Sequence, residues 1–144
     1  NKDVAKDIIF AITGSQTSGL DNPNENYYTI VSDYSIDKNT LQCIGPIKAS
    51  SESLTHAAIY EFDSNITAVV HVHNNSLWKS TMNVIPTTNK NVEYGTPDMA
   101  YEMKRLYNDT NLKDIKVLNM AGHKDGLISF GTTIKEATDI MVNL

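Results

Sequence analysis

The sequence predicts an α/β domain in which helices cover a sheet with much antiparallel pairing. Short runs of β-branched and aromatic residues alternate with segments whose apolar residues recur at helical spacing. These elements do not follow the regular strand–helix–strand rhythm of a parallel sheet, which favours antiparallel pairing. The chain has 144 residues, the length of one domain, so we treat residues 1–144 as a single unit.

The first third of the chain is rich in strand signals. The predicted strands are residues 8–12, 28–34 and 40–44. The first ends at the Gly- and Ser-rich segment 13–19, and the polar segment 21–26 predicts a loop. Because a turn at Asp37–Asn39 separates the second and third strands, we expect these two to form a hairpin.

The rest of the chain alternates helices with strands. The predicted helices are residues 50–62, 76–82, 97–108 and 134–143, and the predicted strands are 67–73, 115–120 and 127–130. Ser50 or Ser51 is expected to cap the first helix. Thr96, which is followed by proline, is expected to cap the third. Thr133 and Glu136 have the spacing of a capping box at the start of the last helix.

Composition argues against several classes of partner. The net charge is −5, which disfavours binding to nucleic acid or to a membrane surface. No apolar run approaches the ~20 residues of a membrane span. Cys43 is the single cysteine, so an internal disulfide is impossible, and we expect a cytoplasmic protein. The chain starts at Asn1 rather than Met, and we expect it to be a segment of a longer protein.

Histidines are the most informative residues for chemistry. His71 and His73 are two positions apart on a predicted strand, so their side chains share a face, ~6.5–7 Å apart at the backbone. Such a pair either binds one divalent ion or consists of a packed histidine and a bystander. His123, in a Gly-flanked loop, would supply the third imidazole of a catalytic metal site. We interpret the fourth histidine, His56, as a packed residue or as one that supports the metal ligands.

Further candidates surround the predicted start of the helix before this strand. Glu52 lies at this helix start, where three roles are open: a fourth metal ligand, a general base, or a partner of the helix dipole. Ser50 and Ser51 lie at the same helix start. They either form an anion site suited to phosphate or only cap the helix. Gly14 and Ser15 belong to a second Gly- and Ser-rich loop, a weaker phosphate candidate because it lacks the lysine of a P-loop.

Several ordered segments together carry a family resemblance that covers nearly the whole chain. They are 50–60 (SSESLTHAAIY), 68–73 (AVVHVH), 94–100 (YGTPDMA), 117–123 (VLNMAGH), 126–131 (GLISFG) and the pair Glu136-Ala137. In this order they resemble the class II aldolase/adducin family. The resemblance implies a three-layer α/β/α domain with a largely antiparallel central sheet.

The resemblance also implies a role for each candidate residue. His71, His73 and His123 would be the three ligands of a divalent metal, usually zinc, and Glu52 the acid/base carboxylate, able to occupy the fourth metal position before substrate binds. Ser50 and Ser51 would bind phosphate. The implied function is that of a metal-dependent aldolase-type lyase, which cleaves or forms a C–C bond in a phosphorylated sugar or similar hydroxy-carbonyl compound through a metal-bound enediolate. The implied assembly is a homotetramer.

Two alternatives stay open, and the chain departs from the family in three places. The alternatives are a sugar-phosphate epimerase or dehydratase with the same site, and a non-catalytic adducin-like interaction domain. Nothing before Ile8 matches the family's upstream phosphate-binding block, so we expect the N-terminal part of the family domain to be missing. The loop after His123 is longer, and Ala49 replaces a common proline. Tyr94 is either a structural residue or, by availability alone, a candidate proton donor.

Overall fold

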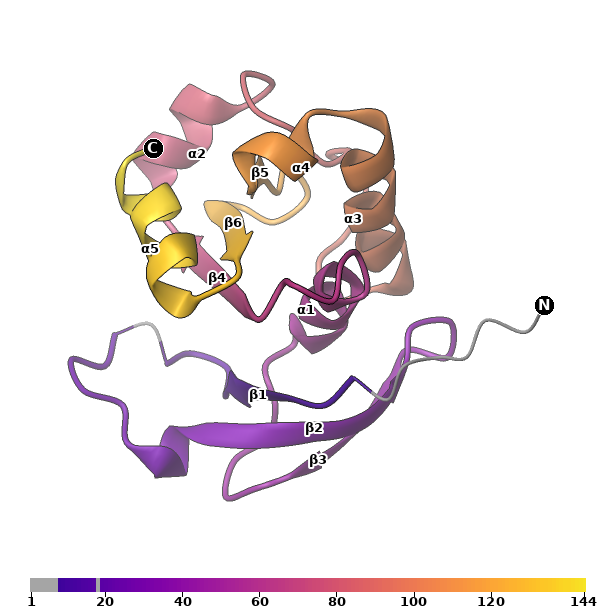
Figure 1. Ribbon diagram of the computed structural model, residues 1–144, viewed down its shortest axis with the longest axis vertical. Coiled ribbons are helices and arrows are strands. Elements are labelled where there is room, and N and C mark those ends of the chain that lie inside the picture. The colour runs from indigo at the N-terminus through magenta and orange to yellow at the C-terminus, as the bar shows by residue number, and fades with distance from the viewer. Residues whose placement is uncertain (1–7, 18) are drawn as a thin grey trace.

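The computed structural model describes residues 8–17 and 19–144, which form an α/β domain with antiparallel sheets, as predicted (Figure 1). The strands are β1 (Phe10–Thr13), β2 (Tyr28–Ser35), β3 (Thr40–Ile44), β4 (Ala68–His73), β5 (Val117–Asn119) and β6 (Gly126–Gly131). The helices are the 3-10 helix η1 (Glu25–Tyr27) and α1 (Ser53–Tyr60), α2 (Asn75–Thr81), α3 (Pro97–Asp109), α4 (Leu112–Ile115) and α5 (Ile134–Val142).

The described strands are divided between two three-stranded sheets rather than joined in one. The first sheet has the order β1-β2-β3 and contains the predicted hairpin, in which Ser35 pairs with Thr40. The second has the order β4-β6-β5, with β6 in the centre. All strand pairs in both sheets are antiparallel.

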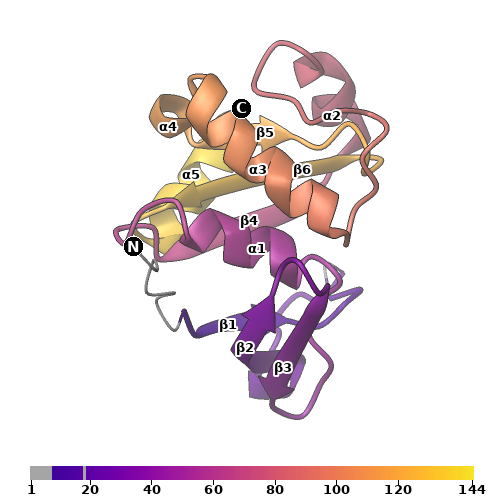
Figure 2. The same ribbon diagram turned by 90° about the vertical axis from the view of Figure 1, so that its right-hand side faces the viewer.

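Helix α1 lies between the two sheets (Figure 2). Every residue from Ser53 to Ile59 is buried, because the helix is covered on opposite sides. Ala57 packs with the apolar residues of the first sheet, whereas Leu54, Ala58 and Ile59 pack with α3 and the second sheet. The helix that carries Glu52 at its start is therefore held by both sheets.

The second sheet is the middle of a helix–sheet–helix arrangement. One face packs against α1 and α3, in a core that includes Met99, Met103 and Phe130. The other face packs against α5 and α2, where Leu127 and Met141 lie in the same cluster. The predicted three layers thus occur around β4-β6-β5, and the first sheet adds a further layer on the far side of α1 (Figure 2).

The start of α1 differs from the prediction. Neither Ser50 nor Ser51 is the N-cap; Glu52 occupies that position and makes no side-chain capping bond. The chain makes a turn before the helix, in which the carbonyl of Ser50 accepts hydrogen bonds from the amide and the hydroxyl of Ser53. This turn moves the start of the helix three residues later than the apolar pattern indicated.

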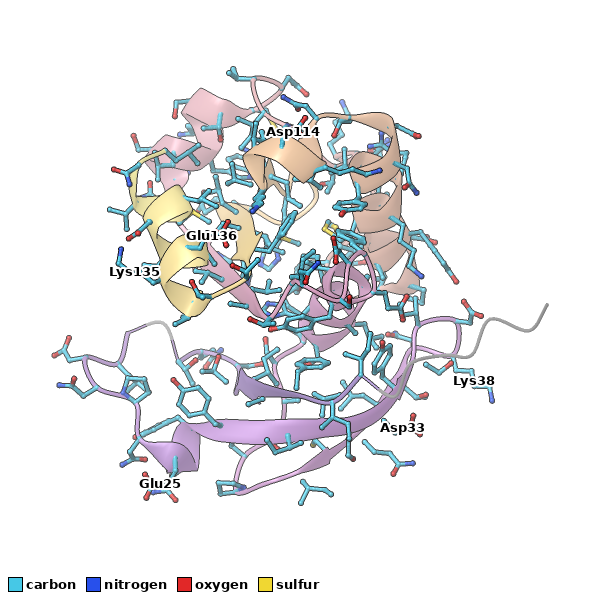
Figure 3. The ribbon with its side chains drawn as sticks, viewed as in Figure 1. Glu25, Asp33, Lys38, Asp114, Lys135 and Glu136 are labelled. Carbon is cyan, nitrogen blue, oxygen red and sulfur yellow. The ribbon has the colours of Figure 1, made fainter. Side chains whose placement is uncertain are left out.

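The last helix begins at the predicted capping box, with one change of partner. The Thr133 hydroxyl accepts a hydrogen bond from the amide of Glu136, as its spacing predicted. The Glu136 carboxylate, in the first turn of α5 (Figure 3), accepts from the amide and the hydroxyl of Thr132 instead of the Thr133 amide. Lys116 also donates to Glu136, so this carboxylate links the helix to the segment before β5.

Thr96 caps α3 as predicted, by accepting from the amide of Met99. Helix α2 is capped by Asn74, the residue that directly follows β4, so the helix starts immediately after the strand that carries His71 and His73. Within the part of the chain described here, no helix has both the length and the apolar character needed to span a membrane.

Candidate metal centre

Strand β4 places two histidines on one face of the second sheet. His71 lies opposite Ile128 and His73 opposite Gly126 on β6, and the alternation of the strand puts Val69 on the same face. Val69 packs in the core formed with α1 and α3, whereas Val72 packs on the opposite side with α5 and α2. Both histidines therefore face the layer to which Glu52 belongs, and their ring centroids are 4.8 Å apart.

His123 reaches the same place from the loop between β5 and β6. Three backbone hydrogen bonds close the loop. The amide of Met120 donates to the carbonyl of Gly126, the amide of Gly126 to the carbonyl of His123, and the amide of His123 to the carbonyl of Met120. The amide of Asn74 donates to the carbonyl of Asp125 over 2.8 Å, which attaches the loop to the end of β4. A residue 50 positions from His73 in the sequence is thereby brought next to it.

The three imidazoles form one compact group. The ring centroid of His123 lies 5.0 Å from that of His71 and 4.6 Å from that of His73. Each residue offers a ring nitrogen, and the three nitrogens lie within 4.8 Å of one another. A set of three imidazole nitrogens suits zinc and other divalent transition metals, and it leaves further coordination positions for other ligands.

Glu52 borders this group at the start of α1. Its side chain is only 2% exposed. The oxygen Oε2 accepts a hydrogen bond of 2.9 Å from the hydroxyl of Thr55, which lies one turn further along the helix. The other oxygen, Oε1, lies 3.4 Å from Nδ1 of His123 without making a hydrogen bond to it. The carboxylate is therefore anchored at one oxygen and directed at the histidines with the other.

Three buried polar atoms of this group have no hydrogen-bond partner in the described chain. They are Oε1 of Glu52, Nε2 of His71 and Nδ1 of His123. A buried polar atom without a partner destabilises a fold by about 1–3 kcal/mol, so three in one place require an explanation. A divalent cation would satisfy such atoms at once, and the donor set fits the metal that the sequence predicted.

Burial and interactions within the group shift the pKa values of Glu52 and His71. Burial raises the pKa of Glu52, but His123, the Thr55 hydroxyl and the charge of His71 together lower it below its usual value. Burial lowers the pKa of His71 to about 3, against the opposing effect of the Glu52 carboxylate. At neutral pH Glu52 is therefore ionised and His71 neutral, which are the forms that bind metal ions.

The four phosphate candidates lie near one another. Gly14 forms an isolated antiparallel bridge with Ala49, and the amide of Ser50 donates to the carbonyl of Thr13, so the loop after β1 lies beside the two serines. The amide and the hydroxyl of Ser50 are both used within the chain, since the hydroxyl accepts from the amide of Glu52. Ser15 and Ser51 are exposed.

Two contacts of the site were not predicted from the sequence. Thr55 follows Glu52 by three positions, a spacing that places both on one side of a helix and could have indicated the contact. Tyr94 stacks on His123, with ring centroids 4.2 Å apart and an interplanar angle of 29°. No spacing rule predicts this second contact, because the residues belong to different loops. His56 is buried in α1, as expected of a packed residue.

These features define an α/β domain with a candidate metal centre between a helix start, a strand and a loop. The chain belongs to the family of class II aldolase and adducin N-terminal domains, whose sequence profile matches residues 10–144. The family resemblance inferred from the sequence segments is thereby confirmed. A comparison with curated proteins found no match.

A solved structure supports the fold. The chain is similar to YgbL from Escherichia coli, which is described as a candidate aldolase/epimerase/decarboxylase, with a TM-score of 0.60 and 20% sequence identity. The similarity covers 85% of this chain and 62% of YgbL, so the chain spans less than two thirds of that protein. At this level of identity the likeness concerns the fold and not the reaction.

Proposed function

We propose that this domain is the catalytic domain of a metal-dependent aldolase-type lyase. Its substrate would be a phosphorylated sugar or a similar hydroxy-carbonyl compound, in which it cleaves or forms a C–C bond. The observation that supports the proposal most strongly is the group of three buried, unpaired polar atoms on Glu52, His71 and His123, completed by His73. A domain used only for binding other proteins has no need to bury such a group.

In this proposal His71, His73 and His123 hold a divalent ion, for which zinc is our first choice. When bound, such an ion acts as a Lewis acid towards the carbonyl and hydroxyl oxygens of a sugar. The protein contributes the position of the imidazoles, which β4 and the closed loop between β5 and β6 determine. It also contributes partial exclusion of water, since the side chain of His123 is 11% exposed.

Glu52 is the proposed acid/base residue, and Oε1 is the atom that would take up the proton. Oε2 accepts from the Thr55 hydroxyl, whereas Oε1 faces the imidazoles and has no hydrogen-bond partner among the described residues. A carboxylate that transfers protons near neutral pH commonly has a pKa raised towards neutrality. The lowered pKa of Glu52 in this structure instead favours the ionised form, which is the state of a general base that awaits its substrate.

The substrate phosphate would bind at the loop after β1 and the turn before α1. The exposed hydroxyls of Ser51 and Ser15 are the proposed donors, and Gly14 allows the two segments to approach closely. A Cβ at Gly14 would lie 2.5 Å from the side chain of Ile47, so a larger residue would push the segments apart. Ser50 would stabilise the backbone of this phosphate-binding site rather than contact the phosphate, because its polar groups form hydrogen bonds within the chain.

Two further properties belong to the proposal. We place the protein in the cytoplasm, supported by the single cysteine, Cys43. We also propose a homo-oligomer, a tetramer by resemblance to the family, without nucleic-acid or membrane partners. Light scattering coupled to size-exclusion chromatography measures the assembly, and a monomer at micromolar concentration would contradict this part.

Elemental analysis of protein purified without a metal-affinity resin is the first test. We expect about one divalent ion per chain in the wild type, and loss of this ion in His71→Ala. The matched control is His56→Gln, which changes a buried histidine outside the group and should keep the metal. Unchanged metal content in His71→Ala would refute the ligand assignment.

A screen of sugar phosphates with the metal-loaded protein then tests the reaction. Retro-aldol cleavage, detected as release of an aldehyde, would support the lyase. Inversion at a carbon or loss of water without C–C cleavage would replace it with the epimerase or dehydratase alternative. A stoichiometric metal without turnover of any sugar phosphate would favour the adducin-like interaction domain.

A further inference from the structure

No hydrogen bond to the described residues orients the imidazole of His123. Neither of its ring nitrogens makes one, and Oε1 of Glu52 lies 3.4 Å from Nδ1 without a bond. In most metal sites a ligating histidine donates its second ring N–H to a carboxylate, a carbonyl or water, which fixes the ring. Another contact must therefore determine how the ring of His123 is turned.

Tyr94 makes that contact. Its ring lies nearly parallel to the imidazole of His123, with 4.2 Å between the centroids and 29° between the planes. Tyr94 remains 46% exposed, so its position is not explained by the burial of its own ring in a core. The stacked face of a tyrosine also favours positive charge on its partner, which an imidazole acquires when it binds a cation.

The backbone places Tyr94 rigidly at this position. Gly95 has a φ of +69°, which a residue with a side chain adopts only with strain, and a Cβ there would lie 3.4 Å from the carbonyl oxygen of Ser51. The Thr96 hydroxyl donates to the carbonyl of Glu93 over 2.6 Å and also caps α3. The loop 93–96 is thus attached to a helix start and lies beside the turn before α1.

The residue directly before the loop 93–96 packs on the loop that carries His123. A Cβ on Gly122 would lie 1.7 Å from the carbonyl oxygen of Val92, so the two backbones are in direct contact. A Cβ on Gly126 would lie 3.2 Å from Cγ of the imidazole, so this backbone is also close to the ring. The ring of His123 therefore lies close to both the Tyr94 ring and the backbone of Gly126.

We infer that Tyr94 is a positioning residue that orients His123 towards a divalent ion through its aromatic ring. The inference rests on the proposed metal centre and adds to it the residue that performs, by stacking, the role that a hydrogen bond usually has. The inference distinguishes the aromatic ring of Tyr94 from its hydroxyl. The metal centre requires the ring and not the hydroxyl.

The test compares metal binding by the wild type, Tyr94→Ala and Tyr94→Phe. Metal-free proteins are titrated with Zn²⁺ by calorimetry and with Co²⁺ by visible absorption, which responds to the arrangement of the ligands. We expect Tyr94→Ala to bind both ions about tenfold more weakly, the lower end of the effect of residues that orient a ligand. Tyr94→Phe keeps the ring and should keep the wild-type affinity and Co²⁺ spectrum.

The matched control is Tyr101→Ala, which removes a tyrosine of similar exposure, 43%, on α3. It should bind the metals like the wild type. Thermal unfolding of the metal-free proteins shows whether a variant is folded, and the partial exposure of Tyr94 predicts a folded Tyr94→Ala. Gly95→Ala, which displaces Tyr94 through the backbone, is the second variant and should also weaken binding.

Wild-type affinity in both Tyr94→Ala and Gly95→Ala would overturn the inference while leaving the metal centre intact. Equal losses in Tyr94→Phe and Tyr94→Ala would also overturn it, since they would assign the effect to the hydroxyl. Absence of metal binding by the wild type itself would overturn the proposed metal centre and this inference with it. Weaker metal binding by Tyr94→Ala, together with wild-type binding by Tyr94→Phe, would support the inference.

Discussion

His56 should make the stability of the metal-free protein depend on pH, and His56→Gln is the change that reveals it. His56 is 8% exposed in α1, between the two sheets. Burial lowers its pKa to about 4, from 6.5 in an unfolded chain. As the pH falls below 6.5, the unfolded chain therefore takes up a proton that the folded protein does not bind, and folding becomes less favourable.

The magnitude follows from these two values. Between pH 6.5 and about 4, the full difference corresponds to about 3 kcal/mol of stability lost from this one group. At pH 5 about 2 kcal/mol of it is already lost, because the unfolded chain is almost fully protonated at His56 while the folded protein is not. Above pH 7 both states are neutral at this residue, so its contribution no longer changes with pH.

Urea unfolding of the metal-free protein at pH 7 and pH 5, in the presence of a chelator, measures this difference. His71 is also buried with a lowered pKa, so the wild type should lose more than the contribution of His56 alone. His71 is present in both proteins, but His56 is one of the groups that lower its pKa, so removing His56 also reduces the loss from His71. His56→Gln should therefore lose at least about 2 kcal/mol less than the wild type between these pH values. The same decline in the wild type and in His56→Gln would refute the reasoning.

Three further variants test other parts of the molecule. Glu52→Gln should keep the fold and the metal but lower kcat by about 10²–10⁴-fold, and near wild-type turnover would remove the acid/base role. Ser51→Ala should raise KM for phosphorylated substrates about tenfold, the loss of one hydrogen bond to a charged group; an equal effect on an unphosphorylated analogue would argue against a phosphate cradle. Gly122→Ala should lower stability by about 1–3 kcal/mol in thermal or urea unfolding, because its Cβ would meet the Val92 carbonyl oxygen at 1.7 Å. Gly19→Ala, where a Cβ meets nothing within 4 Å, is its control, and equal effects would refute the packing argument.

The elements were predictable where the pattern is local. Thr96 and Thr133 cap their helices because a hydroxyl before a helix satisfies free amides whatever the tertiary structure. The four-residue helix α4 was not predicted, since it is too short for a periodic pattern and ends at Lys116, which has a left-handed conformation. The division into two sheets was not predictable either, because it depends on the burial of α1 from both sides.

In the candidate site too, geometry within one element was predictable from the sequence, whereas contacts between distant segments were not. The period of a strand predicted that His71 and His73 share a face, and the structure confirms this geometry. The order of the family segments placed His123 and Glu52 with them. The stacking of Tyr94 on His123 depends on two loops that meet only in the folded chain, and no property of either loop alone indicates it.

The position of α1 between the two sheets has a consequence for how the site assembles. Glu52 acquires its surroundings only when the helix is covered by the first sheet on one side and by the second on the other. His123 follows Glu52 by 71 residues, so closing the site requires contacts of long sequence separation, which form late and slowly in folding. The ability to bind a metal ion would therefore report complete folding of the domain, and a half-folded chain would be unable to sequester the ion.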